Sequence, residues 1–184
     1  MTAVLVAGLV AALLALVALA YNRLVADRNK VADGWAGIDV QLSRRAELVP
    51  NLVATVEAAR VHERDVTEAV TAARSALVDA EGPARNGVAD DLLESALRRL
   101  YAVAEAYPDL KASRNFLALQ EELSALEEDL SFARRYYNAT VERFNTRQQS
   151  FPAMLVAGPL GFAPAEFFKA DAGDRLAPST EFGR

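Results

Sequence analysis

Hydrophobic residues recur in alternating steps of three and four from Tyr21 to Leu77, directly behind an uncharged apolar N-terminus. This spacing places the side chains on one face of a helix, so it predicts a helix that packs along its length against other helices. Charged residues interrupt the stripe at three positions. Its members are Tyr21, Leu24, Arg28, Val31, Trp35, Ile38, Leu42, Arg45, Val49, Leu52, Val56, Ala59, Glu63, Val66, Val70, Ala73 and Leu77.

Pro50 lies inside this stripe without shifting its phase, and its flanks lack Gly, Asp and Ser turn residues. A helix that kinks at Pro50 and continues to about Leu77 therefore fits better than a loop. Because proline removes a backbone donor and clashes with the preceding turn, two antiparallel helices joined near Pro50 are the alternative.

Two further helices follow a cluster of helix breakers at residues 81–87. The pattern predicts one helix over about residues 88–107, stopped by Pro108-Asp109, and a last long helix that begins near Ser113 and ends at Phe151-Pro152. The last helix is acidic in its first half and basic in its second. This order complements the helix dipole, or it turns the basic half toward anionic lipid headgroups.

Residues 1–20 are predicted to form a transmembrane anchor. The run from Ala3 to Ala20 contains Ala, Val, Leu and Gly alone, and as a helix it spans about 27 Å, close to the thickness of the hydrocarbon core. A cleaved signal peptide is the competing interpretation, because Ala18-Leu19-Ala20 has the form of a cleavage site. The lack of Lys or Arg before the run, and Tyr21 directly behind it, favour an uncleaved anchor.

Positive charge lies behind the span and not before it, at Arg23, Arg28 and Lys30. By the positive-inside rule this predicts a single-pass protein of the cell membrane with the bulk of the chain in the cytoplasm. The bilayer is therefore its first expected partner.

The C-terminal part divides into an apolar segment over residues 151–169 and a polar tail over residues 170–184, which is expected to be disordered. Proline and glycine interrupt the apolar segment, so it cannot form a second continuous span. It is predicted to pack on the end of the bundle, with the membrane interface or a partner's groove as alternatives.

The composition is that of one helical domain over residues 21–150. The chain has 184 residues, 52% of them hydrophobic, which suffices for a core and one membrane span. A net charge of −5 and a pI near 5.0 argue against a nucleic-acid partner. The chain lacks cysteine, which excludes disulfides, thiolate metal sites and a cysteine nucleophile.

No catalytic, cofactor or metal site is predicted. His62-Glu63 starts a metalloprotease-like H-E-x-x-H pattern, but Val66 stands where the second histidine is needed. Ala59 stands three residues before His62, where a di-iron bundle places a glutamate. An enzyme is therefore not expected.

Two observations bear on helix pairing. The charged stripe residues Arg28, Arg45 and Glu63 fix helix register if they find partners, but they could instead turn outward, or the arginines could hold an anionic ligand. Tyr21-Asn22, Val25 and Asn29 recur in spacing as Tyr137-Asn138, Val141 and Asn145. This echo indicates either paired helix ends or coincidence.

The chain resembles the LemA family of bacterial membrane proteins. The resemblance lies in residues 21–29, 35–45 and 48–53, and it extends through His62-Glu63, Ala72-Ala73-Arg74, Tyr107 to Ala112, Tyr137-Asn138, Phe144-Asn145, Phe151-Pro152 and Gly161-Phe162. It implies a single N-terminal span, a four-helix bundle, no established enzymatic activity and no agreed ligand. A break near Pro50 would supply four helices directly; otherwise the C-terminal segment supplies the fourth.

The expected fold is thus all-α, an N-terminal transmembrane helix followed by an elongated antiparallel up-and-down bundle. The leading functional hypothesis is a non-enzymatic scaffold or adaptor for an unidentified membrane or cytoplasmic protein. Lipid or small-ligand binding by the C-terminal apolar segment and nearby arginines is the alternative. A homo-oligomer is possible, because heptad seams also pair between chains. The candidate interaction surface comprises Asn22, Asn29, Asp39, Gln41 and Arg44.

Overall fold

A computed structural model describes residues 1–59 and 63–168, and this part of the chain is helical with no β-strand. The helices are α1 (Thr2–Ala58), α2 (Arg64–Val78), α3 (Pro83–Ala104), α4 (Pro108–Lys111), α5 (Arg114–Gln149) and α6 (Met154–Ala157). The predicted all-α class is confirmed. Residues 60–62, with His62, and the predicted tail at 170–184 lie outside the described residues.

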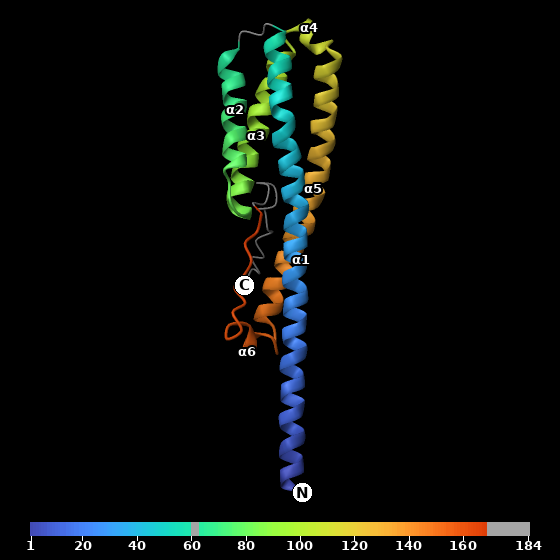
Figure 1. Ribbon diagram of the computed structural model, residues 1–184, viewed down its shortest axis with the longest axis vertical. Helices are drawn as coiled ribbons and strands as arrows, with labels where there is room; N and C mark the ends of the chain where they lie inside the picture. Colours follow the sequence, from blue (N-terminus) through green and yellow to red (C-terminus); the bar gives the residue numbers. More distant parts are fainter. Residues whose placement is uncertain (60–62, 169–184) are drawn as a thin grey trace, which may run out of the picture.

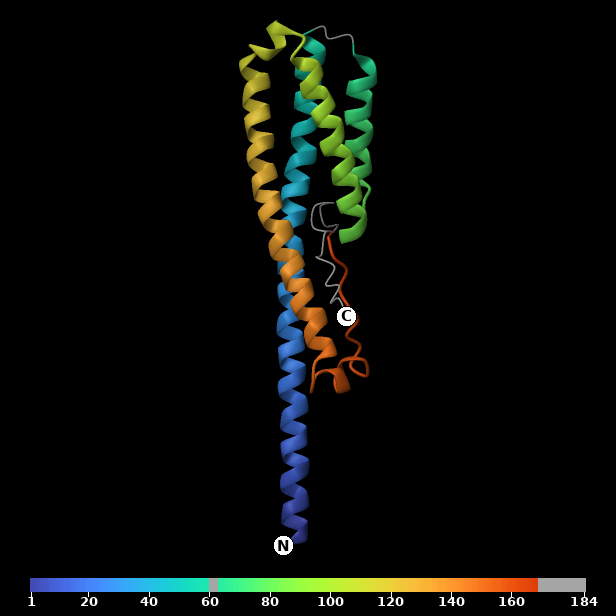
Figure 2. The ribbon, with the colours of Figure 1, turned by 180° about the vertical axis from the view of Figure 1, so that it is seen from behind.

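Four of these helices form an up-and-down bundle. Figures 1 and 2 show α1 and α3 running in one direction and α2 and α5 in the other, while the N-terminal part of α1 extends alone beyond the bundle. Among the described residues, α1 is the one helix long and apolar enough to cross a membrane. The predicted N-terminal membrane helix and elongated bundle are thus confirmed.

The helix α1 continues through Pro50 and ends at Ala58. The predicted continuation of the helix through Pro50 is confirmed, whereas the predicted unbroken run to Leu77 and the alternative break at Pro50 are wrong. Proline cannot donate to the carbonyl four residues earlier, and that carbonyl, on Ala46, instead accepts a 2.7 Å hydrogen bond from Nε of Arg74 in α2. The neighbouring helix thus satisfies the backbone group that Pro50 leaves without its helical donor.

The fourth bundle helix arises because the chain turns back after Ala58. Ala59 caps α1 and Glu63 caps α2, and neither is a glycine or proline. The turn brings Val70, Ala73 and Leu77 into the core. The C-terminal segment, the alternative source of a fourth helix, contributes just the short α6.

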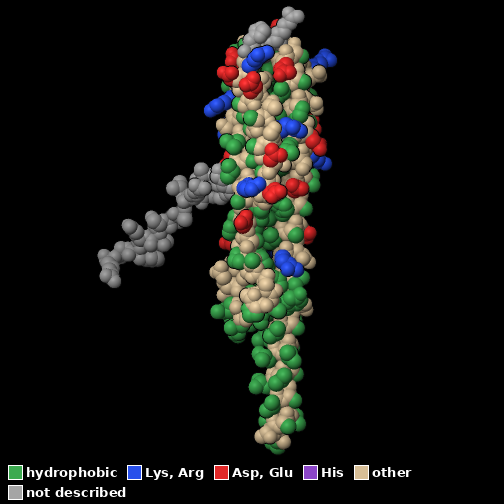
Figure 3. Space-filling view, turned by 60° about the vertical axis from the view of Figure 1, so that its left-hand side comes forward, with side chains coloured by type: hydrophobic (Ala, Val, Ile, Leu, Met, Phe, Trp, Pro, Cys, Tyr) green, Lys and Arg blue, Asp and Glu red, His purple; other side chains and the backbone are tan. Residues whose placement is uncertain are grey.

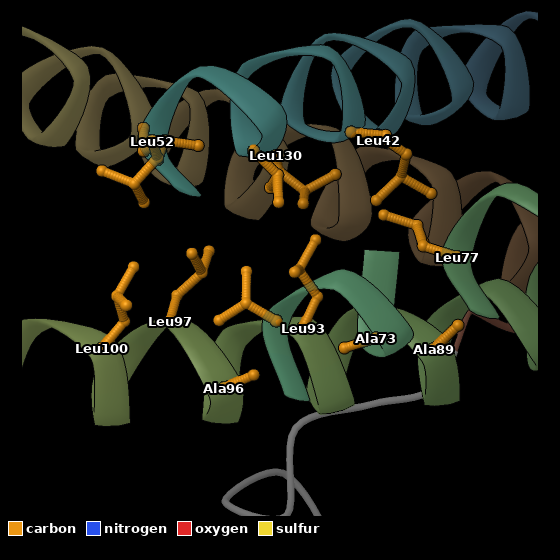
Figure 4. Packing of buried hydrophobic residues seen from close by; sticks show 14 of the residues in the cluster. Leu42, Leu52, Ala73, Leu77, Ala89, Leu93, Ala96, Leu97, Leu100 and Leu130 are labelled. Atoms are coloured by element: carbon orange, nitrogen blue, oxygen red, sulfur yellow. The ribbon is translucent and has the colours of Figure 1, made fainter. Parts of the chain in front are cut away.

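Leucines from different helices meet in the core of the bundle. Figure 4 shows Leu93 and Leu97 of α3 pointing toward Leu42 and Leu52 of α1 and Leu130 of α5. All five side chains are at most 4% exposed. Burying a leucine side chain contributes about 1.5–3 kcal/mol, so these contacts between α1, α3 and α5 stabilise the bundle.

The predicted helix over residues 88–107 begins earlier and ends earlier than expected, at Pro83 and Ala104. Gly82 has φ of 80° and Pro83 follows in the first turn, so these residues start α3 and do not interrupt it. Ser113 stands at the N-cap of α5, as predicted, although its side chain makes no capping hydrogen bond.

The helix α5 is much longer than α2 or α3, so the pair formed by α1 and α5 continues below them toward the apolar part of α1 (Figure 1). The two helices approach closely at Gly34, where an added Cβ would lie 3.3 Å from Cα of Tyr137. Residues 151–168, called the C-terminal segment below, cover one side of this lower pair. They share a second core cluster with it, formed by Ala20, Leu24, Phe144, Ala153, Ala157 and Phe162.

Candidate functional site

A charged quartet joins three helices inside the bundle. It consists of Arg45 on α1, Asp90 on α3, and Glu127 and Arg134 on α5. Nη1 of Arg45 lies 2.8 Å from Oδ1 of Asp90 and 2.6 Å from Oε2 of Glu127. Arg134 pairs with both carboxylates as well. The two arginines and two acids balance each other, which is the condition for burying charge without a large penalty.

Burial raises the pKa of both acids of the quartet. Desolvation raises the pKa of Asp90, and the neighbouring Arg45 and Arg134 oppose that rise without cancelling it. Desolvation likewise raises the pKa of Glu127 against the same two arginines. Every charge in the quartet faces a partner on another helix or on α5 itself, so the quartet is suited to fixing the register of the three helices.

The three charged positions of the stripe behave differently. Arg45 points inward and finds partners, as expected for a residue that fixes register. Arg28 is exposed, with its guanidinium carbon 5.4 Å from the ring centroid of Phe162. Glu63 is exposed at the start of α2. Of these three charged residues, Arg45 alone is therefore buried in the core.

Two asparagines on α5 hold the C-terminal segment by its backbone. Nδ2 of Asn145 donates to the carbonyl of Ala165 at 2.9 Å, and Oδ1 of Asn145 accepts from the amide of Ala165 at 2.8 Å. Oδ1 of Asn138 accepts from the amide of Phe168 at 3.0 Å. The seven residues from Asn138 to Asn145 rise about 10.5 Å along the helix. Three residues of extended chain cover nearly the same length. An asparagine pair seven residues apart therefore matches an extended backbone.

Tyr137 strengthens this attachment. Its hydroxyl donates to the carbonyl of Glu166 at 2.7 Å, and its ring packs edge-on against Trp35. Burial, with a smaller contribution from the Glu166 carboxylate, raises the pKa of Tyr137 to about 12. The hydroxyl therefore stays protonated and available as a donor at neutral pH.

The echo of this pattern on α1 leaves its asparagines exposed. Asn22 and Asn29 have the same seven-residue spacing as Asn138 and Asn145, and both side chains are exposed. No hydrogen bond from either side chain is found within the described part of the chain. We call Asn22 and Asn29 the α1 asparagine pair. Their side-chain amides are exposed to solvent, whereas the matching amides of Asn138 and Asn145 on α5 bind the backbone of an extended segment.

The other candidate residues do not form one surface with this pair. Asp39 and Arg44 are both exposed, but five residues separate them, which is about 140° around a helix. Gln41 is half-buried, and its Oε1 is buried without a hydrogen-bond partner among the described residues. The predicted polar block is therefore spread over different faces of α1.

A groove lies where the apolar part of α1 meets the end of α5. Its volume is 590 Å³, and its walls include Leu16, Leu19 and Arg23 of α1, Arg143 and Arg147 of α5, and Phe151, Pro152 and Ala153 after it. We call it the juxtamembrane groove. Figure 3 shows that charged side chains are plentiful over the upper bundle and become sparse toward this end of the molecule, where hydrophobic side chains gather.

A single buried carboxylate organises the positive charge beside the groove. Asp27 is 4% exposed, it pairs closely with Arg147, and its Oδ1 lies 3.7 Å from Nε of Arg143. Arg23 and Lys30 border the same surface, and neither has an ion-pair partner within the described residues. Asp27 was not singled out from sequence, because its partners lie on another helix more than a hundred residues away.

Metal chemistry finds no support among the described residues, where no group of three or more His, Cys, Asp or Glu side chains is placed to hold an ion. Two described features are suited to binding: an exposed asparagine pair and a basic groove with an apolar floor.

Comparison with known proteins places this fold in a family. A model of the LemA family matches residues 34–182. The chain is 26% identical over 163 residues to a protein described as Protein LemA from Metamycoplasma hominis, a match that covers 86% of this chain and 73% of that relative. The matched region includes α1 from residue 34 onward and all of α2 to α6. With its long apolar N-terminal helix and its helical bundle, this protein belongs to the LemA family.

Proposed function

We propose that this protein is a membrane-anchored, non-enzymatic adaptor that holds an extended segment of a partner protein against the α1 asparagine pair. The observation that carries the proposal is the α5 asparagine pair, which binds the extended backbone of residues 165–168 in the same molecule. The α1 pair offers the same side chains at the same spacing, exposed.

The position of the pair limits the kind of partner. Asn22 lies two residues after the apolar run, and Asn29 lies two turns further along the helix. A segment that reaches both lies within roughly 14 Å of the end of the apolar run along α1. This suits the extended juxtamembrane segment of another membrane protein, or of a second copy of this chain. In the predicted orientation the contact lies on the cytoplasmic side.

Site-specific cross-linking tests the proposal. A photo-reactive residue at Ala26, which is exposed and lies between the two asparagines, would be introduced into the full-length protein in cells. We expect a discrete cross-linked species that disappears in the Asn22→Ala/Asn29→Ala variant. A species with the mass of two chains would identify a homo-oligomer.

The matched control keeps both asparagines and changes Asp39 and Arg44 to alanine. If the partner binds the α1 asparagine pair, this control should leave the cross-link intact. Loss of the cross-link in the control, with retention in the asparagine variant, would move the docking surface to the polar residues higher on α1. Absence of any discrete species would contradict the adaptor role of this face.

Lipid binding is a second candidate function, favoured by the juxtamembrane groove more than by the C-terminal segment itself. The inward side chains of that segment, Ala157, Phe162 and Phe168, are already buried against the bundle. The groove instead combines an open apolar floor with arginine side chains.

A further inference from the structure

The cationic groups around the juxtamembrane groove outnumber the acids. Arg23, Lys30, Arg143 and Arg147 surround the single buried carboxylate of Asp27. Glu142 also lines the groove, but it leaves a positive surplus. Asp27 pairs with Arg147 and lies 3.7 Å from Nε of Arg143, so it keeps both cations beside the groove. Holding cations in place before a ligand arrives lowers the entropic cost of binding an anion.

The groove also crosses the expected boundary between hydrocarbon and headgroups. Leu16 and Leu19 in its floor belong to the apolar run that ends at Ala20. Arg23 stands about one turn further along the same helix. The groove is therefore apolar at the depth of lipid acyl chains and basic at the depth of phosphates.

Exposed apolar side chains are also found next to the groove, in the segment that follows α5. Phe151 is 74% exposed, and Met154, Leu155 and Leu160 are also largely exposed. All four lie in the segment that follows α5 and returns beside α1 (Figure 1). A bilayer around α1 would cover them, whereas water would leave them as an apolar patch with no stabilising contact.

We infer that the juxtamembrane groove binds an anionic phospholipid, with the phosphate between Arg23, Arg143 and Arg147 and an acyl chain along Leu16, Leu19 and Phe151. Arginine forms short, charge-assisted hydrogen bonds with phosphate oxygens. The apolar floor selects a lipid over a free phosphate ion, which would leave that floor uncovered. The inference specifies the second candidate function and does not depend on the adaptor role of the α1 asparagine pair.

Lipid counting on the full-length protein tests the inference. The protein in mild detergent would be mixed with phosphatidylglycerol or with phosphatidylcholine of the same acyl chains, and bound lipids counted by native mass spectrometry at low salt. We expect phosphatidylglycerol to bind several-fold more tightly. The Arg23→Gln/Lys30→Gln variant should weaken phosphatidylglycerol binding by about thirtyfold, since each basic residue near an anionic surface contributes about 1 kcal/mol and two are removed. It should leave phosphatidylcholine binding unchanged.

The variant keeps the ion pairs of Asp27, so the fold of the lower bundle is preserved. Its matched control, Arg44→Gln/Arg135→Gln, removes the same charge from exposed positions of α1 and α5 away from the groove. Equal binding of the two lipids, or an equal loss in the control, would overturn the inference. Competition by millimolar glycerol phosphate would show that the site takes a soluble phosphate, and would overturn the assignment to a lipid. Ala26 borders the same surface as Arg23 and Lys30. The adaptor role is therefore tested with the Asn22→Ala/Asn29→Ala variant and the lipid site with Arg23→Gln/Lys30→Gln, so either proposal can fail alone.

Discussion

The upper and lower halves of the α1–α5 pair are covered in two different ways. In the upper half, α2 and α3 complete a four-helix core of leucines with the charged quartet between them. In the lower half, a segment broken by proline and glycine takes the place of helices. Its backbone is attached by hydrogen bonds that Tyr137 and Asn145 donate and that Asn138 accepts.

The difference separates stability from binding. A helix satisfies its own backbone and offers just side chains to its neighbour, whereas an extended segment must find partners for its N–H and C=O groups elsewhere. The lower half supplies those partners from asparagines. The same half carries the exposed α1 asparagine pair and the juxtamembrane groove, so the candidate binding features lie where the helical cover ends.

The largest effect is expected in the upper half, from Asp90→Ala. This change leaves Arg45 and Arg134 buried without their shared carboxylate, and breaking a buried ion pair costs about 3–5 kcal/mol. Urea unfolding of the full-length protein in mild detergent, followed by circular dichroism, measures the loss. The exposed Asp39→Ala variant should change the free energy of unfolding by less than about 0.5 kcal/mol. A similarly small loss for Asp90→Ala would contradict the structural role of the quartet.

Phe162→Ala is the matching change in the lower half. The ring of Phe162 contacts Tyr21, Phe144 and Arg28, and removing a buried phenylalanine ring costs about 3 kcal/mol or more. We expect the loss to stay local: faster proteolysis of the C-terminal segment with unchanged hydrogen exchange in α2 and α3. The exposed Leu160→Ala variant is the control. Equal loosening of α2 and α3 would show that the halves are not independent.

Asn145→Ala tests the hydrogen-bonded attachment by itself. It removes both bonds to Ala165, one as donor and one as acceptor, and unsatisfied backbone groups cost about 1–3 kcal/mol. Hydrogen–deuterium exchange should accelerate at the amides of residues 165–168. Asn29→Ala, an asparagine of the α1 pair, should leave those amides protected. Protection that persists in Asn145→Ala would assign the attachment to the aromatic contacts instead.

A smaller, coupled effect is expected between Pro50 and Arg74. Arg74→Met removes the donor that serves the Ala46 carbonyl, whereas Pro50→Ala restores a helical donor to the same carbonyl. The cost of Arg74→Met should therefore be lower in the Pro50→Ala background by about 1 kcal/mol. If the two changes in the free energy of unfolding simply add in the double mutant, the proposed coupling between Pro50 and Arg74 of α2 is contradicted.

The smallest effect concerns pH in the upper half. The pKa values of Asp90 and Glu127 are raised in the folded protein, so the folded state binds protons that the unfolded state releases. The stability they contribute is full below their unfolded values of 3.8 and 4.5 and is lost as the pH rises through the folded values. Unfolding free energies measured across this range should show a weaker pH dependence in Asp90→Asn. An unchanged slope would exclude Asp90 as its source.

Local periodicity was enough to predict the helices because one face of each must be buried. Leu24, Ile38, Leu52 and Val70 of the predicted stripe are all fully buried. The uncharged run before Tyr21 likewise required nothing beyond length and composition. The division of the polar block into separate faces was also available from sequence, since five residues on a helix turn a side chain by about 140°.

The position of the turn after Ala58 could not be predicted from the sequence, because no glycine or proline stands between Ala58 and Arg64. The heptad phase continues across it, so the local pattern of one long helix and of two antiparallel helices is the same. Packing therefore decides between one long helix and two antiparallel helices, because the antiparallel arrangement buries Val70 and Leu77. Pro50, the strongest local breaker in that region, was outweighed by the hydrogen bond from Arg74.

The sequence by itself therefore determined the apolar N-terminal helix, the helical class, the buried face of each long helix and the resemblance to the LemA family. The tertiary structure alone decided which charges meet. Arg45 and Asp90 are 45 residues apart, and Asn145 reaches Ala165 across a reversal of the chain. Periodicity is a property of neighbouring residues, whereas ion pairs, backbone attachments and grooves depend on the distance between segments that the chain brings together only when it folds.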